Sequence, residues 1–190
     1  MRPATAPSTK LTYEDFLNFP DDGKRHEIID GEHFVTPSPN TKHQCVVGNL
    51  YMALRSHLEA DQIGAVFLAP FDVVFSDLDV VEPDLLYISR ERAGILTEKH
   101  VRGAPDLVVE ILSPGTRKTD EAIKRKLYER FDVHEYWVVD PELDAIKVHR
   151  RVEGVFTRAA ELGAEAGDTL TTPLLPDFSV ALADVFASPI

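Results

Sequence analysis

Two acidic residues in apolar surroundings are the side chains of this sequence that most need a chemical explanation. Glu110 lies within the otherwise aliphatic run Leu107–Leu112, where an unpaired carboxylate is expensive to desolvate. Asp84 follows Pro83 and precedes a second apolar run. If neighbouring strands bring both acids to one end of a sheet, their charges repel, and a divalent cation is the usual way to keep both ionised. Oxygen ligands of this kind favour Mg²⁺ or Mn²⁺ over zinc.

A helix predicted over residues 119–131 adds a positive charge to this pair. Its apolar face, at about 100° per residue, is formed by Ile123, Leu127 and Phe131. Asp120 and Lys124 fall inside that face, and Tyr128 follows Lys124 by four residues. A lysine directed at two carboxylates can neutralise charge developing on a phosphodiester or orient an attacking water. Together these residue types indicate metal-assisted phosphodiester hydrolysis.

Buried strands are predicted to carry the two acids. Leu107–Leu112 and Glu135–Val139 are rich in β-branched and aromatic residues, as expected of central strands covered on both faces. Ala65–Phe75 and Val80–Ile88 are predicted as two strands joined by a polar turn, and Pro83 puts the later one at an edge or a bulge.

Elements near the N-terminus are predicted from caps and periodicity. Thr12 and Asp15 indicate the start of a short helix that stops near Pro20. Asp30-Gly31 is typical of a tight hairpin turn between strands at 26–29 and 32–35. Apolar residues at spacings of three and four predict an amphipathic helix over about 40–59, with His43 at its start.

The C-terminal part is predicted to be mainly hairpins. Ala145–Arg150 begins one, Val152–Ala160 is expected to pair with Thr169–Leu175, and a short helix is expected around Ser179–Phe186. No internal repeat or linker is apparent. We therefore expect one α/β (α+β) domain over residues 11–190, preceded by a mobile N-terminal arm at residues 1–10.

Composition excludes several classes of protein. The chain has 190 residues, 44% of them hydrophobic, which is too many for an intrinsically disordered protein, and its apolar runs are too short to span a membrane. The single Cys45 cannot form an internal disulfide, and the N-terminus lacks an apolar signal segment, so a cytoplasmic location is expected. A net charge of -12 argues against binding nucleic acid by bulk electrostatics.

These residues resemble a known nuclease family. Pro83-Asp84 followed by Glu110 is similar to the signature of the PD-(D/E)xK nuclease superfamily. More specifically, the run 26–31 and the stretch 105–141 are similar to the Uma2-type (DUF820) restriction endonuclease family, and the resemblance extends from about Thr12 to Phe186. It implies a restriction-endonuclease-like fold, with a mixed central β-sheet flanked by the helices at about 40–59 and 119–131.

The resemblance also implies roles for individual residues. Asp84 and Glu110 would hold Mg²⁺ or Mn²⁺, and Glu27 matches an N-terminal acid of the family that completes the catalytic carboxylates. The superfamily lysine is replaced by Leu112, which implies that Lys124 on the following helix takes its place. Supporting contacts to the catalytic groups are expected from His43, Asp106, Asp120 and Tyr128. The implied function is a Mg²⁺-dependent endonuclease that hydrolyses DNA, acting as a homodimer.

Other interpretations remain open from the sequence. Glu110 and Lys124 could form a buried ion pair without a metal, in which case the chain would be a catalytically inactive binding or regulatory module. A metal-dependent hydrolase of smaller phosphoesters is a further alternative. Asp106 lies about 13 Å from Glu110 along an extended strand, so a turn role competes with any role in the site. An open cation site would favour the nuclease, and a sealed ion pair the binding module.

Overall fold

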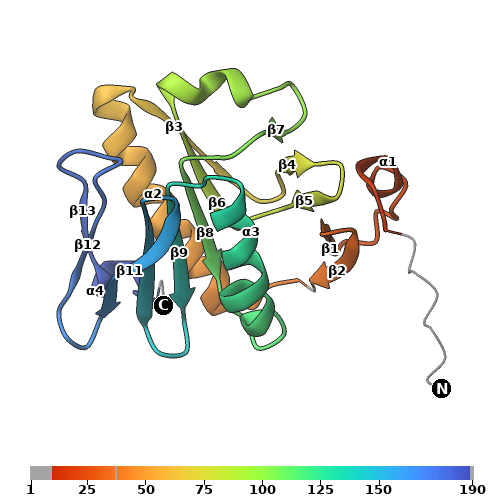
Figure 1. Cartoon of the computed structure of the whole chain (residues 1–190). Helices are drawn as coiled ribbons and strands as arrows, with labels where there is room; N and C mark the ends of the chain where they lie inside the picture. Colours follow the sequence, from red (N-terminus) through yellow and green to blue (C-terminus); the bar gives the residue numbers. More distant parts are fainter. Residues whose placement is uncertain (1–9, 37, 189–190) are drawn as a thin grey trace.

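The computed structural model describes residues 10–36 and 38–188. Its main feature is a six-stranded sheet in the order β11-β10-β9-β8-β6-β3 (Figure 1). Its strands are β3 (Gly64–Leu68), β6 (Leu85–Ser89), β8 (Leu107–Ile111), β9 (Glu135–Asp140), β10 (Ala145–Val152) and β11 (Val155–Gly163). The neighbours β8 and β9 run parallel, and the other pairs are antiparallel. A mixed sheet of this kind is the predicted fold class.

A second, five-stranded sheet lies beside the first in the order β2-β1-β5-β4-β7. Its strands are β1 (Arg25–Ile29), β2 (Glu32–Thr36), β4 (Val73–Ser76), β5 (Asp79–Val81) and β7 (Val101–Arg102). The predicted hairpin of β1 and β2 is confirmed: Asp30 and Gly31 form its turn with φ of 51° and 75°. Two residues with positive φ in a two-residue turn match the right-handed twist of the flanking strands.

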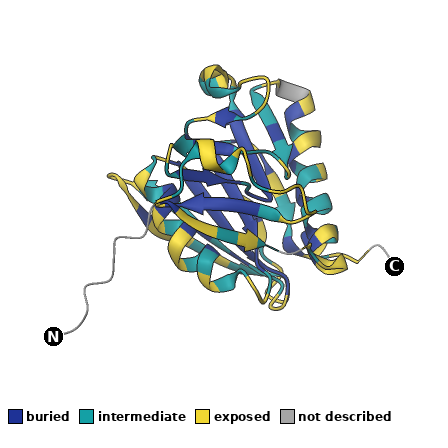
Figure 2. Cartoon of the chain, turned by 90° about the vertical axis from the view of Figure 1, so that its right-hand side faces the viewer, coloured by how far each residue is buried: buried dark blue, intermediate teal, exposed yellow. Residues whose placement is uncertain are grey.

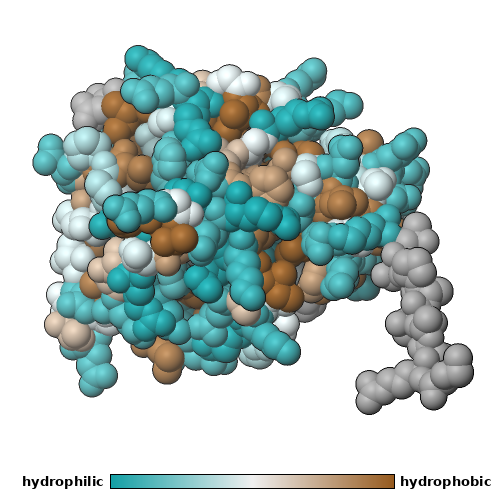
Figure 3. All heavy atoms as spheres, viewed as in Figure 1, coloured by the Kyte–Doolittle hydropathy of each residue, from teal (hydrophilic) through white to brown (hydrophobic). Residues whose placement is uncertain are grey.

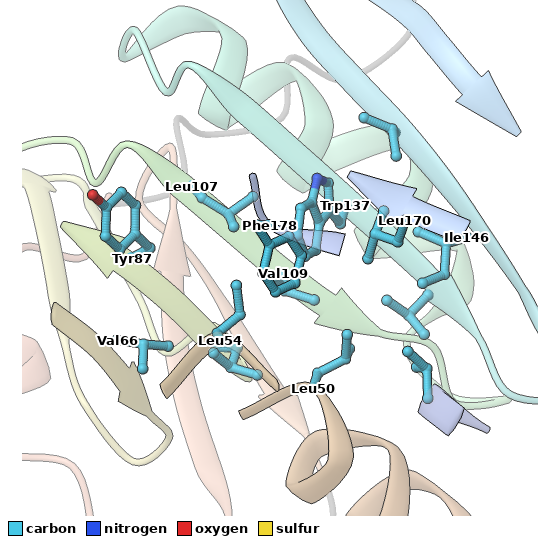
Figure 4. Close-up of a cluster of buried hydrophobic side chains, with 14 of the residues drawn as sticks. Leu50, Leu54, Val66, Tyr87, Leu107, Val109, Trp137, Ile146, Leu170 and Phe178 are labelled. Atoms are coloured by element: carbon cyan, nitrogen blue, oxygen red, sulfur yellow. The ribbon is translucent and has the colours of Figure 1, made fainter. Parts of the chain in front are cut away.

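Two helical segments cover opposite faces of the six-stranded sheet (Figures 1 and 2). The helix α2 (Thr41–Asp61) packs through Leu50 and Leu54 against Val109, in the cluster of buried side chains drawn in Figure 4. Val108 belongs to a second buried cluster, which contains residues of the helix α3 (Arg125–Arg130) and of the five-stranded sheet. Because successive strand residues point to opposite faces, the even-numbered Glu110 belongs to the second layer.

The helix predicted over 119–131 is divided in two. Its first half, η2 (Thr119–Lys124), is a π-helical segment, and α3 continues it. The expectation that Ile123 lies on the apolar face is wrong, since its exposed fraction is 36%. The wider turn of a π-helix breaks the 100° spacing on which that expectation rested, but Asp120 and Lys124 are still buried.

Two strand assignments are corrected. Each of the stretches predicted as one strand, 65–75 and 80–88, contributes one strand to each sheet: β3 and β6 to the larger, β4 and β5 to the smaller. The peptide bond between Ala69 and Pro70, in the segment that crosses from β3 in one sheet to β4 in the other, is cis. Pro83 lies in the second crossing, between β5 and β6, and not inside a strand. Asp84 therefore occupies the segment that links the two sheets.

The C-terminal hairpins also differ from the prediction. Residues 155–163 (β11) pair with β10, and not with 169–175; β12 (Thr169–Thr171) pairs with β13 (Ser179–Ala181). The short helix α4 (Leu182–Val185) follows, within the predicted range. The strand β11 pairs with β10 because β10 extends to Val152, and the chain turns there so that Val155 begins the antiparallel partner.

Two short helices complete the described chain. The predicted α1 (Tyr13–Phe16) begins with a capping box between Thr12 and Asp15, and a 3₁₀-helix, η1 (Arg90–Ile95), follows β6. Apart from Lys10, the arm expected at residues 1–10 lies outside the described residues. Within the described ranges, no helix is both long and apolar enough to cross a membrane.

The cap of α2 gives a first testable prediction. The side chain of Asn40 accepts a hydrogen bond of 2.9 Å from the backbone N–H of His43. Asn40→Ala should lower the free energy of unfolding by about 1 kcal/mol, whereas Asn40→Asp, which keeps the acceptor, should change it little. Urea denaturation of the three proteins measures the difference. Equal midpoints for wild type and Asn40→Ala would contradict a stabilising role for this cap.

Candidate functional site

The candidate site lies where the five-stranded sheet and η2 meet one face of the larger sheet. Glu27 comes from β1, Glu110 from β8, and Lys124 from the end of η2. Lys124 Nζ lies 2.8 Å from Glu27 Oε1 and 2.9 Å from Glu110 Oε1. All three side chains are buried. Three elements far apart in the sequence thus meet at a single ammonium group.

Strand alternation explains why β1 supplies two of the charged groups. Residues two apart on a strand share a face, so Arg25, Glu27 and Ile29 point the same way. Ile29 belongs to the buried cluster of this layer. Glu27 Oε1 also accepts a 2.9 Å hydrogen bond from the backbone N–H of Glu82, which fixes the segment leading into Asp84.

Asp84 is held as an ionised carboxylate. Its Oδ1 accepts a 2.7 Å hydrogen bond from Arg25 Nη1, and its Oδ2 accepts from the backbone N–H of Ile111 at 2.8 Å and from His43 Nε2 at 3.2 Å. Burial opposes ionisation, but the His43 hydrogen bond and the Arg25 charge outweigh it and lower the pKa of Asp84 to about 2. The contact with Ile111 places Asp84 beside the residue that follows Glu110.

Glu110 is bound on one side only. Its Oε1 accepts hydrogen bonds from Tyr128 OH at 2.6 Å and from Lys124 Nζ at 2.9 Å. Within the described residues no hydrogen bond falls on its Oε2. Burial raises the pKa of Glu110 above the ordinary carboxyl range, an effect that the Lys124 charge only partly offsets. Glu110 therefore has one oxygen fixed and one available to a proton or a cation.

The π-helical segment brings in a fourth acid. Asp120 Oδ1 lies 3.6 Å from Lys124 Nζ, and the carbonyl of Asp120 accepts a 3.1 Å hydrogen bond from Tyr136 OH. Asp120 is buried, and burial raises its pKa despite the nearby Lys124 charge. Asp120 and Tyr128 therefore contact members of the cluster, as expected for supporting residues, and His43 does so through Asp84.

Asp106 does not join these groups. It lies before the start of β8, where its Oδ2 accepts a 2.7 Å hydrogen bond from the backbone N–H of Ser89 and its Oδ1 pairs with Arg92 and His134 at 3.6 and 3.3 Å. These contacts brace the connections at that end of the strand. The structure thus supports the turn role of Asp106 over a supporting role in the site.

The balance of charge in the cluster is the observation that bears on a metal ion. Four carboxylates face two permanent cations and leave an excess of two negative charges when all are ionised; the groups are Glu27, Asp84, Glu110, Asp120, Arg25 and Lys124. Hard oxygen donors with this excess suit one Mg²⁺ or Mn²⁺ ion. The contacts are closed, however: among the described residues no three acids, histidines or cysteines stand ready to ligate a metal. A cation at Asp84 competes with Arg25, whereas Glu110 can offer Oε2 and keep Lys124 on Oε1.

Asp84 is also an acid of the cluster that lines an open cavity. A pocket of about 660 Å³ has Asp84, Arg25 and His43 among its lining residues. Glu110 and Lys124 are not among its lining residues, so they lie behind Asp84 as seen from the pocket. A ligand in this cavity meets Asp84 and Arg25 first.

The basic stretch around η2 and α3 is largely neutralised. Arg117 pairs with Asp140 and Glu142, and Arg130 pairs with Asp79. The face seen in Figure 3 is accordingly a mixture of hydrophilic residues with separate hydrophobic patches. These arginines are engaged in ion pairs with acids of the same chain, so their charges are not free to contact a DNA backbone.

Sequence reasoning missed Arg25. A signal was present, because Arg25 directly precedes the strand predicted at 26–29 and shares the face of Glu27 once the strand begins one residue earlier, as β1 does. Its guanidinium bonds Asp84 and the carbonyl of Glu82 at 3.1 Å. What the sequence could not give was the link between the sheets that places residues 82–84 opposite this strand.

Comparison with known proteins agrees with the fold and the resemblance. The family model "Uma2: Putative restriction endonuclease" matches residues 13–183. The sequence matches none of the curated proteins. Four chains of solved structures match, among them "a putative nuclease belonging to DUF820 from Anabaena variabilis ATCC 29413", with a TM-score of 0.78 and 21% identity over 93% of this chain and 97% of that chain. This similarity shows a common fold, which is restriction-endonuclease-like. The family match covers most of the sequence, and the chain therefore belongs to the Uma2 family of restriction-endonuclease-like proteins.

Proposed function

We propose that the protein is a divalent-metal-dependent endonuclease that hydrolyses phosphodiester bonds of DNA. The family supports a nuclease in general terms. Metal-dependent cleavage of DNA is supported by the cluster around Lys124. In this cluster the acids outnumber the permanent cations by two, and one of the acids, Asp84, lines an open pocket. Charge excess and access together are what a catalytic cation site requires.

Asp84 and Glu110 are the residues that would hold Mg²⁺ or Mn²⁺. Asp84 is already ionised, and Oε2 of Glu110 accepts no hydrogen bond from the part of the chain that the structure describes. When bound, such an ion lowers the pKa of an attacking water and offsets the charge that develops on the phosphate. The metal would also supply, at this one point, positive charge that a chain of net charge -12 lacks.

The other side chains of the cluster orient these two acids. Tyr128 and Lys124 hold Glu110 Oε1, so that Oε2 is the oxygen left for a ligand. His43 must carry its proton on Nε2 to donate to the ionised Asp84. Lys124 keeps its charge, since the surrounding acids raise its pKa despite burial. That charge is available to stabilise the phosphorane-like transition state.

One observation favours the binding or regulatory module. Lys124 is sealed between Glu27 and Glu110, with only 5% of its side chain exposed, which is the dry ion pair expected of an inactive member. In that case Arg25 and Lys124 would be permanent counter-ions and no cation would bind. Titration with metal separates the two functions.

The first prediction from the proposed function concerns the metal and the acids together. Wild type should bind Mn²⁺ in isothermal titration and cleave plasmid DNA, and Asp84→Asn or Glu110→Gln should reduce both by at least about a hundredfold, because each removes a ligand charge. Glu121→Gln is the matched control: Glu121 lies beside Asp120 on η2 but pairs with Lys147 at 2.7 Å outside the cluster. Undiminished cleavage by either variant, or an equal loss in the control, would contradict the assignment.

The second prediction follows from the raised pKa of Glu110. A carboxyl whose folded-state pKa lies above its unfolded value makes the folded protein less stable as the pH rises through that interval. Metal-free protein should therefore lose stability between about pH 5 and pH 8, and Mn²⁺ should restore it because binding expels the proton. Melting temperatures with and without Mn²⁺ across this range test the effect. A metal-induced shift that does not grow with pH would argue against Glu110 as a ligand.

The third prediction concerns the cation that competes with the metal. Arg25→Ala should lower the dissociation constant for Mn²⁺ roughly tenfold, because it removes the positive charge bonded to Asp84. Lys24→Ala removes a charge from the same pocket, but Lys24 pairs with Asp22 at 3.0 Å and leaves Asp84 untouched. Calorimetric titration of both variants measures the contrast. Weaker binding by Arg25→Ala would mean that Arg25 supports the site and does not compete for it.

A further inference from the structure

The pocket that contains Asp84 extends well beyond the charged cluster. Its lining also includes Phe16 at the end of α1, together with Leu17 and Phe19, which follow that helix. Its volume of about 660 Å³ lies within the range of about 300–1,000 Å³ that encloses small organic ligands. A single cavity therefore joins a candidate phosphodiester-cleaving centre to an apolar, partly aromatic wall.

That wall is fixed from behind by a network of rings and charges. The Phe19 ring lies 4.4 Å from the His33 ring and 5.6 Å from the Phe16 ring, measured between centroids. His26 bonds His33 at 2.9 Å through Nδ1 and Asp22 at 3.0 Å through Nε2. A wall held in this way loses little conformational freedom when a flat ligand packs against it.

Leu17 shows that the wall is left uncovered. Its exposed fraction is 64%, while it lines the pocket. The exposure of a single leucine needs no explanation, but here it adjoins two phenylalanines and a cavity that leads to Asp84. The position of the apolar surface beside the reactive acids is what points to a ligand with both a phosphate and an apolar ring.

Charge in the pocket argues against a duplex as that ligand. Arg25 and Lys24 are paired with Asp84 and Asp22, and the same cavity is lined by three further acids, Asp21, Asp72 and Glu82. Duplex DNA is bound mainly through rows of lysine and arginine on its phosphates. Single strands have a lower charge density and bind largely by stacking of their bases on aromatic side chains.

We propose that the wall formed by Phe16, Leu17 and Phe19 binds an unpaired base next to the phosphate at Asp84 and Arg25. The preferred substrate is accordingly single-stranded or locally unpaired DNA. This inference rests on the proposed nuclease function and adds its substrate class. The apolar wall supplies the affinity that the acidic chain cannot obtain from phosphate contacts, and Asp84 lies at the point where the strand leaves the wall.

The test uses two leucines that are equally exposed. Leu17→Glu places a charge on the wall, and Leu143→Glu does the same on the turn between β9 and β10, where Leu143 is 71% exposed and does not line the pocket. Phe19→Ala removes an aromatic ring, with its melting temperature recorded to show that it folds. The probe is a fluorescently labelled oligothymidine, alone or annealed to oligoadenosine, with Ca²⁺ for anisotropy measurements and Mn²⁺ for cleavage.

We expect wild type to bind and cleave the single strand at least about tenfold better than the duplex. Leu17→Glu and Phe19→Ala should weaken binding of the single strand roughly tenfold, while Leu143→Glu should match wild type. Equal preference for duplex, or equal behaviour of Leu17→Glu and Leu143→Glu, would overturn the inference and leave the nuclease function intact. Tight binding of the single strand that depends on Leu17, without cleavage in Mn²⁺, would support the base site and contradict the nuclease.

Discussion

The ammonium group of Lys124, buried between Glu27 and Glu110, is the interaction on which the arrangement of this molecule depends. It joins the five-stranded sheet, the central strand of the larger sheet and the π-helical segment at one point. Removing one partner of such a group leaves an uncompensated buried charge, which is far more damaging than losing a surface pair. The relative placement of the two sheets and of Asp84 between them is therefore tied to the charge state of the cluster.

The chemistry of the site depends on how the negative charge of its buried acids is balanced. An excess of acids cannot remain fully ionised in a buried place without a counter-charge. The described structure meets the demand with Lys124, with Arg25 and with a raised pKa at Glu110. A divalent cation would meet the same demand differently, and would free the arginine for a phosphate in the pocket. The same acids can thus be neutralised either by the buried ion pairs or by a bound divalent cation.

Much of this was accessible from the sequence, and the failures have physical causes. An acid within the apolar run 107–112 identified Glu110 as a candidate site residue. Helical spacing correctly placed Lys124 on the sheet side of its helix, although this turn is π-helical and leaves Ile123 exposed. The crossing of residues 82–84 between two sheets was not predictable, because local patterns describe strands and not the sheet that each strand joins. Arg25 was missed for that reason. The C-terminal pairing failed because several β-rich segments compete for the same partner.

The central claim is that Asp84 and Glu110 together hold a divalent cation that replaces Arg25 at Asp84, while Lys124 stays on Glu110 Oε1. Anomalous diffraction from crystals grown with Mn²⁺ tests it most directly. We expect one anomalous peak within about 2.2 Å of an oxygen of each acid, with Arg25 displaced from Asp84. Crystals that show no peak there, with both ion pairs unchanged at saturating Mn²⁺, would contradict the claim and identify the cluster as a structural ion pair.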